Sequence, residues 1–462
     1  MLDKTIAQAV LDAALSTGGD FAEIFWEDRR NNVLTLMDNR LEAVNAGRMH
    51  GAGIRVYTGL SAVYTYTNDT SREGLLRCAA QAAAAVSAQG RRVSAAPLRE
   101  LILSNRHPVL LTPSKTPARQ KAEVLRAANA AAREKGSEIV QVVCNYRDSE
   151  QDVCIANSEG LYATDRRTYT RLSCQVVASN GTESQVGSEG PGAMRGFELF
   201  QGHVDPAATG RKAAETAIKM LHAPVCPAGV MPVAIDNGFG GVIFHEACGH
   251  SLEATSVAFG TSEFSGKLGQ QIAAPCVTAV DDGTLPNEWG SENIDDEGTP
   301  TTRLVLIENG ILKNYMIDRL NGKRMGMAPT GSARRESYAF APTSRIRNTY
   351  IAAGNDDNAE IIATMGDGLY AAKMGGGSVN PATGEFNFAV QEGYLVRDGK
   401  ITTPVRGASL IGKGAEILMR IDRVGRDMTM AQGMCGSLSG SVPTNVGQPL
   451  IRVSAMTVGG RA

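Results

Sequence analysis

A chain of 462 residues, 43% apolar and 20% charged, is long enough for two or three globular domains with a substantial core. Its formal net charge of -2 offers no electrostatic basis for binding nucleic acid or an anionic membrane. The sequence lacks the roughly 20 consecutive apolar residues that span a bilayer, and Asp3 and Asp12 interrupt the apolar run that a secretory signal needs. We therefore expect a cytoplasmic protein with no nucleic-acid or membrane partner.

The first predicted domain, residues 1–105, has the order helix, strands, helix. Apolar residues spaced by four at the N-terminus predict an amphipathic helix. Alternating segments follow, and they predict strands that turn at Asp38-Asn39 and near Gly59. An alanine-rich helix over residues 71–88 is expected to begin at a serine cap.

A proline-rich linker leads into the second predicted domain, residues 106–224, which has the same general order of elements. It carries a helix-like segment at each end and β-rich sequence from Glu138 to about Ser179. Further prolines mark the boundary to the third predicted domain, residues 225–462.

The third domain contains many glycines and short β segments. Asn309-Gly310 and Asp398-Gly399 predict two tight hairpins, and a single helix interrupts the β-rich sequence. The predicted fold class is α+β: an N-terminal region of helices and antiparallel sheet, then a mostly β C-terminal domain that contains one buried metal-binding helix.

That helix lies in the segment DNGFGGVIFHEACGHSLE, which begins at Asp236. Apolar residues would bury it on nearly every side, so His245, Glu246 and His250 need partners inside the fold. Two imidazoles and a carboxylate are the parts of a hydrolytic zinc site, namely two neutral ligands and a base. A bare H-E-x-x-x-H motif is also compatible with ordinary, partly buried histidines.

The spacing of the two histidines requires an irregular helix. The common H-E-x-x-H pattern separates its histidines by about 40° on the helical wheel, so both reach one ion. His245 and His250 are five residues apart, which is about 140° on an ideal helix. A one-residue π-bulge or a break must therefore intervene if both bind one metal, and Gly249 is placed to allow it.

The segment GFGGVIFHEACGHSLEA resembles the signature of TldD-type metallopeptidases in the TldD/PmbA family, which have an H-E-x-x-x-H site. The similarity continues through MGGGSVNPATGEFNFAVQEGYLV and GMCGSLSGSVPTNVGQP, while the N-terminal half matches more loosely. The resemblance implies that His245, His250 and Cys435 bind zinc and that Glu246 is the catalytic carboxylate. Because PmbA/TldE-type subunits lack the histidine motif, this chain resembles the active partner.

Cys435 also suits a metal site on chemical grounds, because two histidines need at least one more ligand and a thiolate suits zinc. Neighbouring glycines would let its backbone approach closely. The eight cysteines include no C-x-x-C pair, which indicates reduced, mostly buried thiols. The alternative for Cys435 is therefore a small buried hydrophobe. Cys248, three residues after His245, is a rival ligand that we interpret as a packing residue.

Four further features have open interpretations. Glu253 can orient an imidazole as a hydrogen-bond acceptor, or be an ordinary carboxylate. The acidic runs at 281–282 and 295–297 have the glycine, threonine and proline neighbours of turns rather than of a second metal site. The run Gly375-Gly376-Gly377 is not a nucleotide loop, and it indicates either an ordinary loop or a peptide contact. A salt-bridged face or a peptide-terminus contact is the interpretation of Arg334, Arg335, Arg345 and Arg347.

The resemblance implies a zinc-dependent peptidase that hydrolyses unfolded or short peptides, bound in extended form, by a metal-activated water with Glu246 as general base. It also implies a dimer, commonly with a TldE/PmbA-type subunit. The alternative is a non-catalytic peptide-binding or regulatory subunit with structural zinc. Structural sites have four protein ligands and catalytic sites three plus water, so two histidines and one cysteine favour catalysis.

Overall fold

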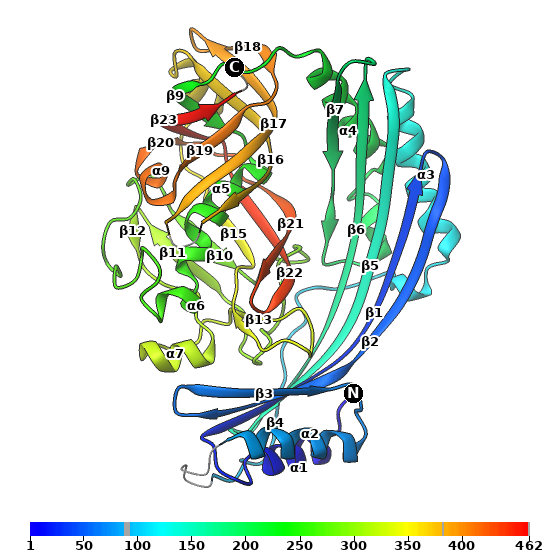
Figure 1. Ribbon diagram of the computed structural model, residues 1–462, viewed down its shortest axis with the longest axis vertical. Coiled ribbons are helices and arrows are strands. Elements are labelled where there is room, and N and C mark those ends of the chain that lie inside the picture. The colour runs from blue at the N-terminus through cyan, green and yellow to red at the C-terminus, as the bar shows by residue number, and fades with distance from the viewer. Residues whose placement is uncertain (87–92, 381–382, 461–462) are drawn as a thin grey trace.

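Four very long strands build the N-terminal half of the protein in this computed structural model, which describes residues 1–86, 93–380 and 383–460 (Figure 1). They are β1 (Phe21–Met37), β2 (Arg40–Thr58), β5 (Ile139–Asn157) and β6 (Leu161–Ser179). Each has 17 or 19 residues, against five or six in an average strand. Shorter strands complete an eight-stranded sheet of order β3-β2-β1-β5-β6-β4, in which β7 and β8 also pair with β6. These are β3 (Ser61–Thr67), β4 (Arg99–Leu101), β7 (Ser184–Glu189) and β8 (Gly192–Ala193).

The two predicted N-terminal blocks share this one sheet. β1 from the first block pairs antiparallel with β5 from the second, without a register shift, from Glu23 opposite Asn157 to Met37 opposite Val143. The predicted turn at Asp38-Asn39 is confirmed, because both residues have the positive φ that a tight hairpin requires. The residue boundaries of the blocks stay predictions.

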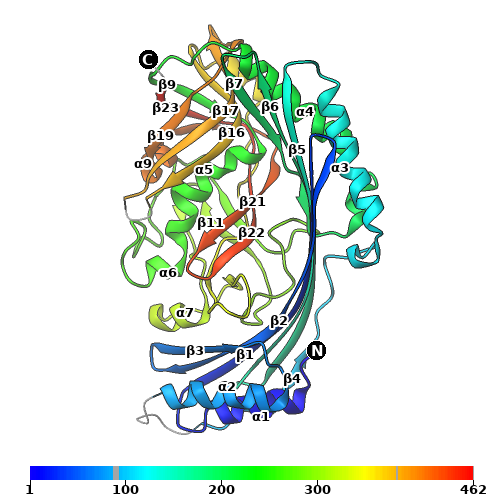
Figure 2. The same cartoon turned by 45° about the vertical axis from the view of Figure 1, so that its right-hand side comes forward.

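Helices cover one face of the sheet in two pairs (Figures 1 and 2). The pairs are α1 (Lys4–Ala14) with α2 (Arg72–Ala85), and α3 (Ala118–Arg133) with α4 (Pro206–His222). Even-numbered residues of β1 pack against both pairs, Ile24 at one end and Leu34 at the other. Because side chains alternate along a strand, odd-numbered residues point to the opposite face. Phe25 packs there against Ile294, so this face is directed toward the C-terminal domain.

The C-terminal domain contains two larger sheets. One has the order β12-β11-β10-β15-β22-β21, and the other has the order β16-β9-β23-β19-β17-β18 with β20 on β23. The strands of the first are β10 (Ala279–Asp282), β11 (Arg303–Glu308), β12 (Ile311–Leu312), β15 (Asn348–Ile351), β21 (Thr429–Ser437) and β22 (Gly440–Gln448). Those of the second are β9 (Gly229–Ile235), β16 (Gly368–Val379), β17 (Glu385–Arg397), β18 (Lys400–Val405), β19 (Ser409–Lys413), β20 (Ile421–Val424) and β23 (Ile451–Gly459). Smaller elements are β13 (Ala333–Arg334), β14 (Thr343–Ser344), α5 (Val242–Phe244), α6 (Ala254–Val257), α7 (Arg319–Met325), α8 (Asn358–Ala363) and α9 (Gly414–Arg420).

The core of this domain lies between its two sheets and includes the predicted helix. Phe244, Ala247, Cys248 and Leu252 are buried there among residues from both sheets. The predicted hairpins at Asn309-Gly310 and Asp398-Gly399 connect β11 to β12 and β17 to β18. The predicted α+β class, with one buried short helix in a mostly β domain, is therefore confirmed. Over the ranges that the structure describes, no helix is long and apolar enough to cross a membrane.

Candidate metal centre

The predicted helix is built from three short pieces of different pitch. α5 passes into a π-helical turn over His245–Gly249 and then into a 3-10 turn over His250–Leu252. Because a π-turn bonds residues five apart, it brings His245 and His250 to the same side. Their ring centroids are 4.9 Å apart, with the rings at 83° to each other. The predicted departure from α-helical geometry is confirmed.

Close packing, rather than an unusual backbone angle, explains the glycines around this turn. Gly249 has ordinary right-handed dihedrals, φ -52° and ψ -54°, so the conformational reason that the sequence suggested is wrong. A Cβ at Gly249 would lie 2.9 Å from Cδ1 of Ile346. The constraint is stronger at Gly414, where a Cβ would lie 1.9 Å from the carbonyl oxygen of Ala247 in the π-turn. The irregular turn is therefore held by its neighbours.

Strand β21 brings Cys435 to the two histidines. Its Sγ lies 3.3 Å from Nε2 of His250, and one ligand atom each from His245, His250 and Cys435 lie within 4.8 Å of one another. Among the residues that the structure describes, this is the one group of at least three His, Cys, Asp or Glu side chains close enough to hold a metal ion. The rival Cys248 is fully buried in the apolar core, as its interpretation as a packing residue requires.

Two glutamates flank the ring of His250 on opposite nitrogens. Oε2 of Glu253 lies 3.3 Å from Nδ1, and Oε2 of Glu246 lies 3.8 Å from Nε2. Glu253 is buried, and its other carboxylate oxygen accepts the backbone N–H of Ile346. This is the orienting contact that a ligand histidine commonly receives. The Glu246 side chain is 25% exposed, and it has no hydrogen bond to any other residue in the described part of the chain.

The Cys435 thiol and the His250 imidazole of this group favour each other's charged forms. Burial opposes ionisation of Cys435, yet hydrogen bonds and charges from His245 and His250 lower the pKa of its thiol to about 3. Burial also opposes a charged His250, but Glu253 and Cys435 raise the pKa of its imidazole well above the usual range. A thiolate and two imidazoles are soft and borderline ligands that suit zinc.

One buried nitrogen atom without a hydrogen-bond partner tests whether these residues fit a metal. Nδ1 of His245 is buried and has no hydrogen-bond partner in the described part of the chain. A buried imidazole nitrogen without a hydrogen-bond partner lowers the free energy of unfolding by about 1–3 kcal/mol. A cation bound to the ring would supply a partner and remove part of this cost. The residues therefore fit a zinc ion.

The strand that carries Cys435 is fixed by an arginine whose role the sequence did not reveal. Arg345 is fully buried and donates to the Cys435 carbonyl, to Oγ of Ser439 at 2.9 Å and to the Gly440 carbonyl at 2.8 Å. It therefore holds the β21–β22 hairpin in shape. No sequence motif marks this contact, since it depends on backbone carbonyls 90 or more residues away.

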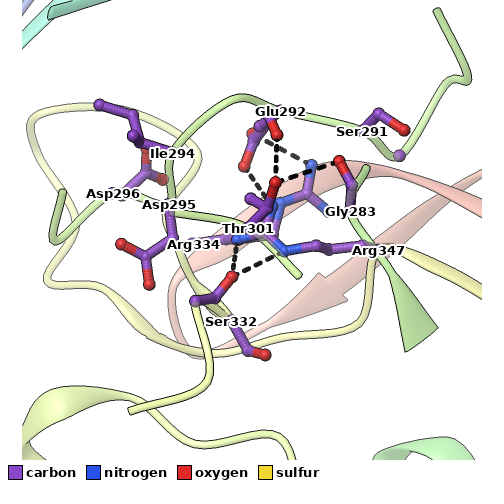
Figure 3. Close-up of polar contacts among 12 residues, drawn as sticks. Gly283, Ser291, Glu292, Ile294, Asp295, Asp296, Thr301, Ser332, Arg334 and Arg347 are labelled. Atoms are coloured by element: carbon purple, nitrogen blue, oxygen red, sulfur yellow. Dashed lines mark hydrogen bonds and ion pairs between the residues drawn. The ribbon is translucent and has the colours of Figure 1, made fainter. Parts of the chain in front are cut away.

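The other three arginines of the predicted cluster are also buried, and each forms a salt bridge, which supports the salt-bridged interpretation but places it inside the fold. Figure 3 shows Glu292 facing the guanidinium groups of Arg334 and Arg347, with N–O distances of 3.4 and 2.5 Å. Arg335 pairs with Glu23 of β1 at 3.1 Å. These arginines form internal ion pairs.

The remaining open features are structural. Asp281 and Asp282 end strand β10, and Asp282 caps the turn that follows by accepting the backbone N–H of Thr284 at 2.8 Å, whereas Asp295 accepts that of Thr299 at 2.8 Å within the turn predicted for the second run. The run Gly375-Gly376-Gly377 lies in strand β16, which corrects its interpretation as a loop. A Cβ at Gly377 would lie 2.3 Å from the carbonyl oxygen of Asn387 on β17.

Comparisons with known proteins agree along the chain. Models of the PmbA/TldA metallopeptidases match it in three parts: domain 1 at residues 22–86, the central domain at 111–221 and the C-terminal domain at 228–460. A metalloprotease TldD homolog from Haemophilus influenzae is 35% identical over 96% of this chain and 93% of its own length.

Two further comparisons extend this result. A zinc metalloprotease TldD homolog from Saccharolobus solfataricus is 32% identical over 53% of this chain and 54% of its own length. The crystal structure of TldE from Thermococcus kodakarensis shares the fold, with a TM-score of 0.78 at 18% identity, over 98% of this chain and all of that one. The similarity to the Haemophilus protein over nearly the whole length shows that the chain belongs to the PmbA/TldD family and is a metallopeptidase.

Proposed function

We propose that the protein is a zinc-dependent peptidase in which His245, His250 and Cys435 hold the metal and Glu246 is the general base. The convergence of these three ligands, with the Glu246 carboxylate 3.8 Å from Nε2 of His250, supports the proposal. A zinc ion, when bound, supplies a Lewis acid for the scissile carbonyl and lowers the pKa of water.

The protein's own residues divide the remaining work. Glu246 accepts a proton from the attacking water and passes it to the leaving amine. Its carboxylate is free for this task because no other described side chain or backbone group binds it. Glu253 holds the His250 ring in one orientation through Nδ1.

The substrates in this proposal are unfolded or short peptides, bound in extended form. β21, the strand of Cys435, stands at the end of its sheet order, so one of its edges has no neighbouring strand among the described residues. An extended peptide can align with such an edge, where recognition depends on backbone more than on side chains. A dimer with a TldE/PmbA-type subunit is part of the proposal, and the shared fold with TldE supports it.

Glu246→Gln tests the base. The amide is close in shape but cannot accept the proton, so single-turnover cleavage of an unfolded peptide should fall by about 10² to 10⁴, or roughly 3–5 kcal/mol of barrier. Zinc per chain should stay unchanged. The control is Glu308→Gln, an exposed glutamate outside the site, which should keep the wild-type rate. Wild-type cleavage by zinc-loaded Glu246→Gln would contradict the mechanism.

A pair of cysteine variants tests the third ligand. Cys435→Ala should lose zinc together with activity, whereas Cys248→Ala should keep its zinc because that thiol lies in the apolar core. Zinc content after dialysis measures the difference. The opposite pattern would make Cys248 the ligand.

A further inference from the structure

A cavity lies between the helix-free face of the N-terminal sheet and the β21–β22 hairpin. Its volume is about 320 Å³, and its walls include Trp289, Met434 and Pro443 on the side of the C-terminal domain. Pockets of this size accept small ligands. Met434 lines this cavity, while the next residue, Cys435, faces His250. Because side chains alternate along a strand, the cavity and the metal centre lie on opposite faces of β21.

Positive charge exceeds negative charge around this cavity, since six arginines and three carboxylates line it. Each of the three carboxylates already has partners. Asp148 pairs with Lys121 at 2.5 Å, Glu336 accepts the backbone N–H of Ser441 at 2.7 Å, and Glu292 belongs to the buried ion pairs of Figure 3. Carboxylates outside the cavity neutralise three more of the arginines, since Arg29 pairs with Glu27, Arg335 with Glu23 and Arg167 with Asp296.

The excess is concentrated on two arginines that stand directly opposite each other. Arg147 of β5 and Arg171 of β6 are cross-strand partners, an arrangement in which like charges destabilise a sheet. Arg171 donates to the backbone carbonyls of Gly190 and Gln432, at 3.0 and 3.1 Å. Neither arginine has a carboxylate partner within the described ranges, and Arg147 has no partner of any kind there.

The neighbouring row on the same face is also unsatisfied. Asn31 of β1 stands opposite Ser149 of β5, which stands opposite Tyr169 of β6. All three line the cavity, and none of their side chains has a hydrogen-bond partner among the residues described. The Arg147 guanidinium, two hydroxyls and an amide thus form a floor whose hydrogen-bonding capacity is open, and Arg171 adds the donors that Gly190 and Gln432 do not use.

We propose that this cavity binds the C-terminal carboxylate of a short peptide. Paired guanidinium groups bind a carboxylate with short, charge-assisted hydrogen bonds, often in bidentate geometry. Asn31 and Ser149 would meet the adjoining peptide groups, and Trp289 and Met434 provide apolar contact for a side chain. The peptide as the source of the carboxylate rests on the proposed peptidase function, whereas the uncompensated arginines do not depend on it.

Binding is tested in the full-length Glu246→Gln protein, so that the peptide is not cleaved. The probe is N-acetyl-tetraalanine with a free C-terminal carboxylate, compared with the same peptide carrying a C-terminal amide. Tryptophan fluorescence reports the event, because Trp289 lines the cavity whereas Trp26 lies in the core beneath α1 and α2. We expect the free acid to bind about tenfold to a hundredfold more tightly than the amide.

Arg147→Gln should remove this preference, and Arg147→Lys, which keeps the charge but not the planar fork, should retain part of it. The matched control is Arg40→Gln, an exposed arginine on β2 of the same sheet and outside the cavity, which should keep the full preference. A melting temperature of Arg147→Gln at or above that of the parent shows that a lost preference is not due to misfolding.

Two results would overturn the proposal: equal affinity for acid and amide, or a preference that survives Arg147→Gln. A fluorescence response to inorganic phosphate that is stronger than that to the peptide acid would overturn the assignment to peptides. Failure of the proposed function is distinguishable, because wild-type protein that cleaves no peptide while the acid preference persists would refute the peptidase and leave the cavity site standing.

Discussion

Two groups of arginines lie in or next to the cavity, and they differ in what neutralises them. Arg167, Arg334 and Arg347 all pair with Glu292, at 3.3, 3.4 and 2.5 Å, and all are buried. Arg147 of β5 and Arg171 of β6 have no carboxylate partner among the described residues. The comparison teaches that a group of arginines does not itself indicate a ligand site. Arginines that lack a counter-ion are the better indication of such a site.

The number of nearby opposite charges also sets the pKa of two buried glutamates. Burial opposes the charge of Glu292, but the guanidinium groups of Arg167, Arg334 and Arg347 lower its pKa to about 2. Burial raises the pKa of Glu297 to about 8, because Arg55 is its one guanidinium partner in the described chain and the nearby acids Asp318 and Glu23 oppose ionisation. Equal burial therefore gives opposite shifts when the number of nearby cations differs.

The largest effect is expected from Glu292→Gln, which leaves three buried guanidinium groups without their common anion. Removing one partner of a buried ion pair typically costs about 3–5 kcal/mol, so the free energy of unfolding should fall by at least that order. Chemical denaturation measures it, with Glu308→Gln as an exposed control that should change stability by less than about 0.5 kcal/mol. A loss below about 1 kcal/mol would show that the other partners suffice, namely Asp165 and Asp296 for Arg167 and backbone carbonyls for Arg334 and Arg347.

An intermediate, pH-dependent effect is expected from Glu297→Gln. Between the unfolded pKa of about 4.3 and the folded pKa of about 8, the native protein holds a proton that the unfolded chain has lost. This residue's contribution to stability is thus complete below the lower value and is lost as pH rises through the upper one, with a slope of at most about 1.4 kcal/mol per pH unit. The unfolding free energy of wild type minus that of Glu297→Gln should therefore decline from pH 5 to pH 8. A difference that is constant or rises with pH would contradict the raised pKa.

The smallest effect is expected from Arg147→Gln, and its sign is the informative part. Removing one of two like charges opposite each other should stabilise the sheet by a few tenths of a kcal/mol, within the roughly 0.2–1 kcal/mol of cross-strand pairs. The gain should shrink in high salt, because Arg147 is exposed. Arg40→Gln should give no comparable gain. A destabilised Arg147→Gln would mean that the pair holds the sheet together rather than awaiting an anion.

Local elements of the fold were predictable because their signals are local. The Asp38-Asn39, Asn309-Gly310 and Asp398-Gly399 turns were readable from residues that tolerate positive φ. The joining of the two N-terminal blocks was not predictable, because it depends on the register of β1 against β5, more than 100 residues apart. No short pattern in either strand specifies that pairing.

The candidate site also has one part that was predictable from local sequence and one part that was not. The five-residue spacing of His245 and His250 indicated the irregular turn, since ideal helix geometry cannot direct both rings to one point. The position of Arg345 behind Cys435, and of Arg147 opposite Arg171, follows from long-range pairing and has no local signal. Gly249 was identified for the wrong reason, because the sequence cannot reveal that Ile346 packs against it.

The long strands of the N-terminal sheet also have a mechanical consequence. At about 3.3 Å per residue, the 19 residues of β5 form a continuous strand of about 60 Å, whose register against β6 shifts only near its start, between Ile139 and Gln141. Where the chain leaves this sheet, between α4 and β9, Cys226 and Pro224 are hydrogen-bonded to Arg406 of the C-terminal domain. We therefore expect the N-terminal sheet and the C-terminal domain to form a stiff frame that does not open and close. If the proposed function holds, a peptide would have to fit the cavity between the N-terminal sheet and the β21–β22 hairpin as it stands, and the width of that cavity, not a closing movement, would set which chains are admitted.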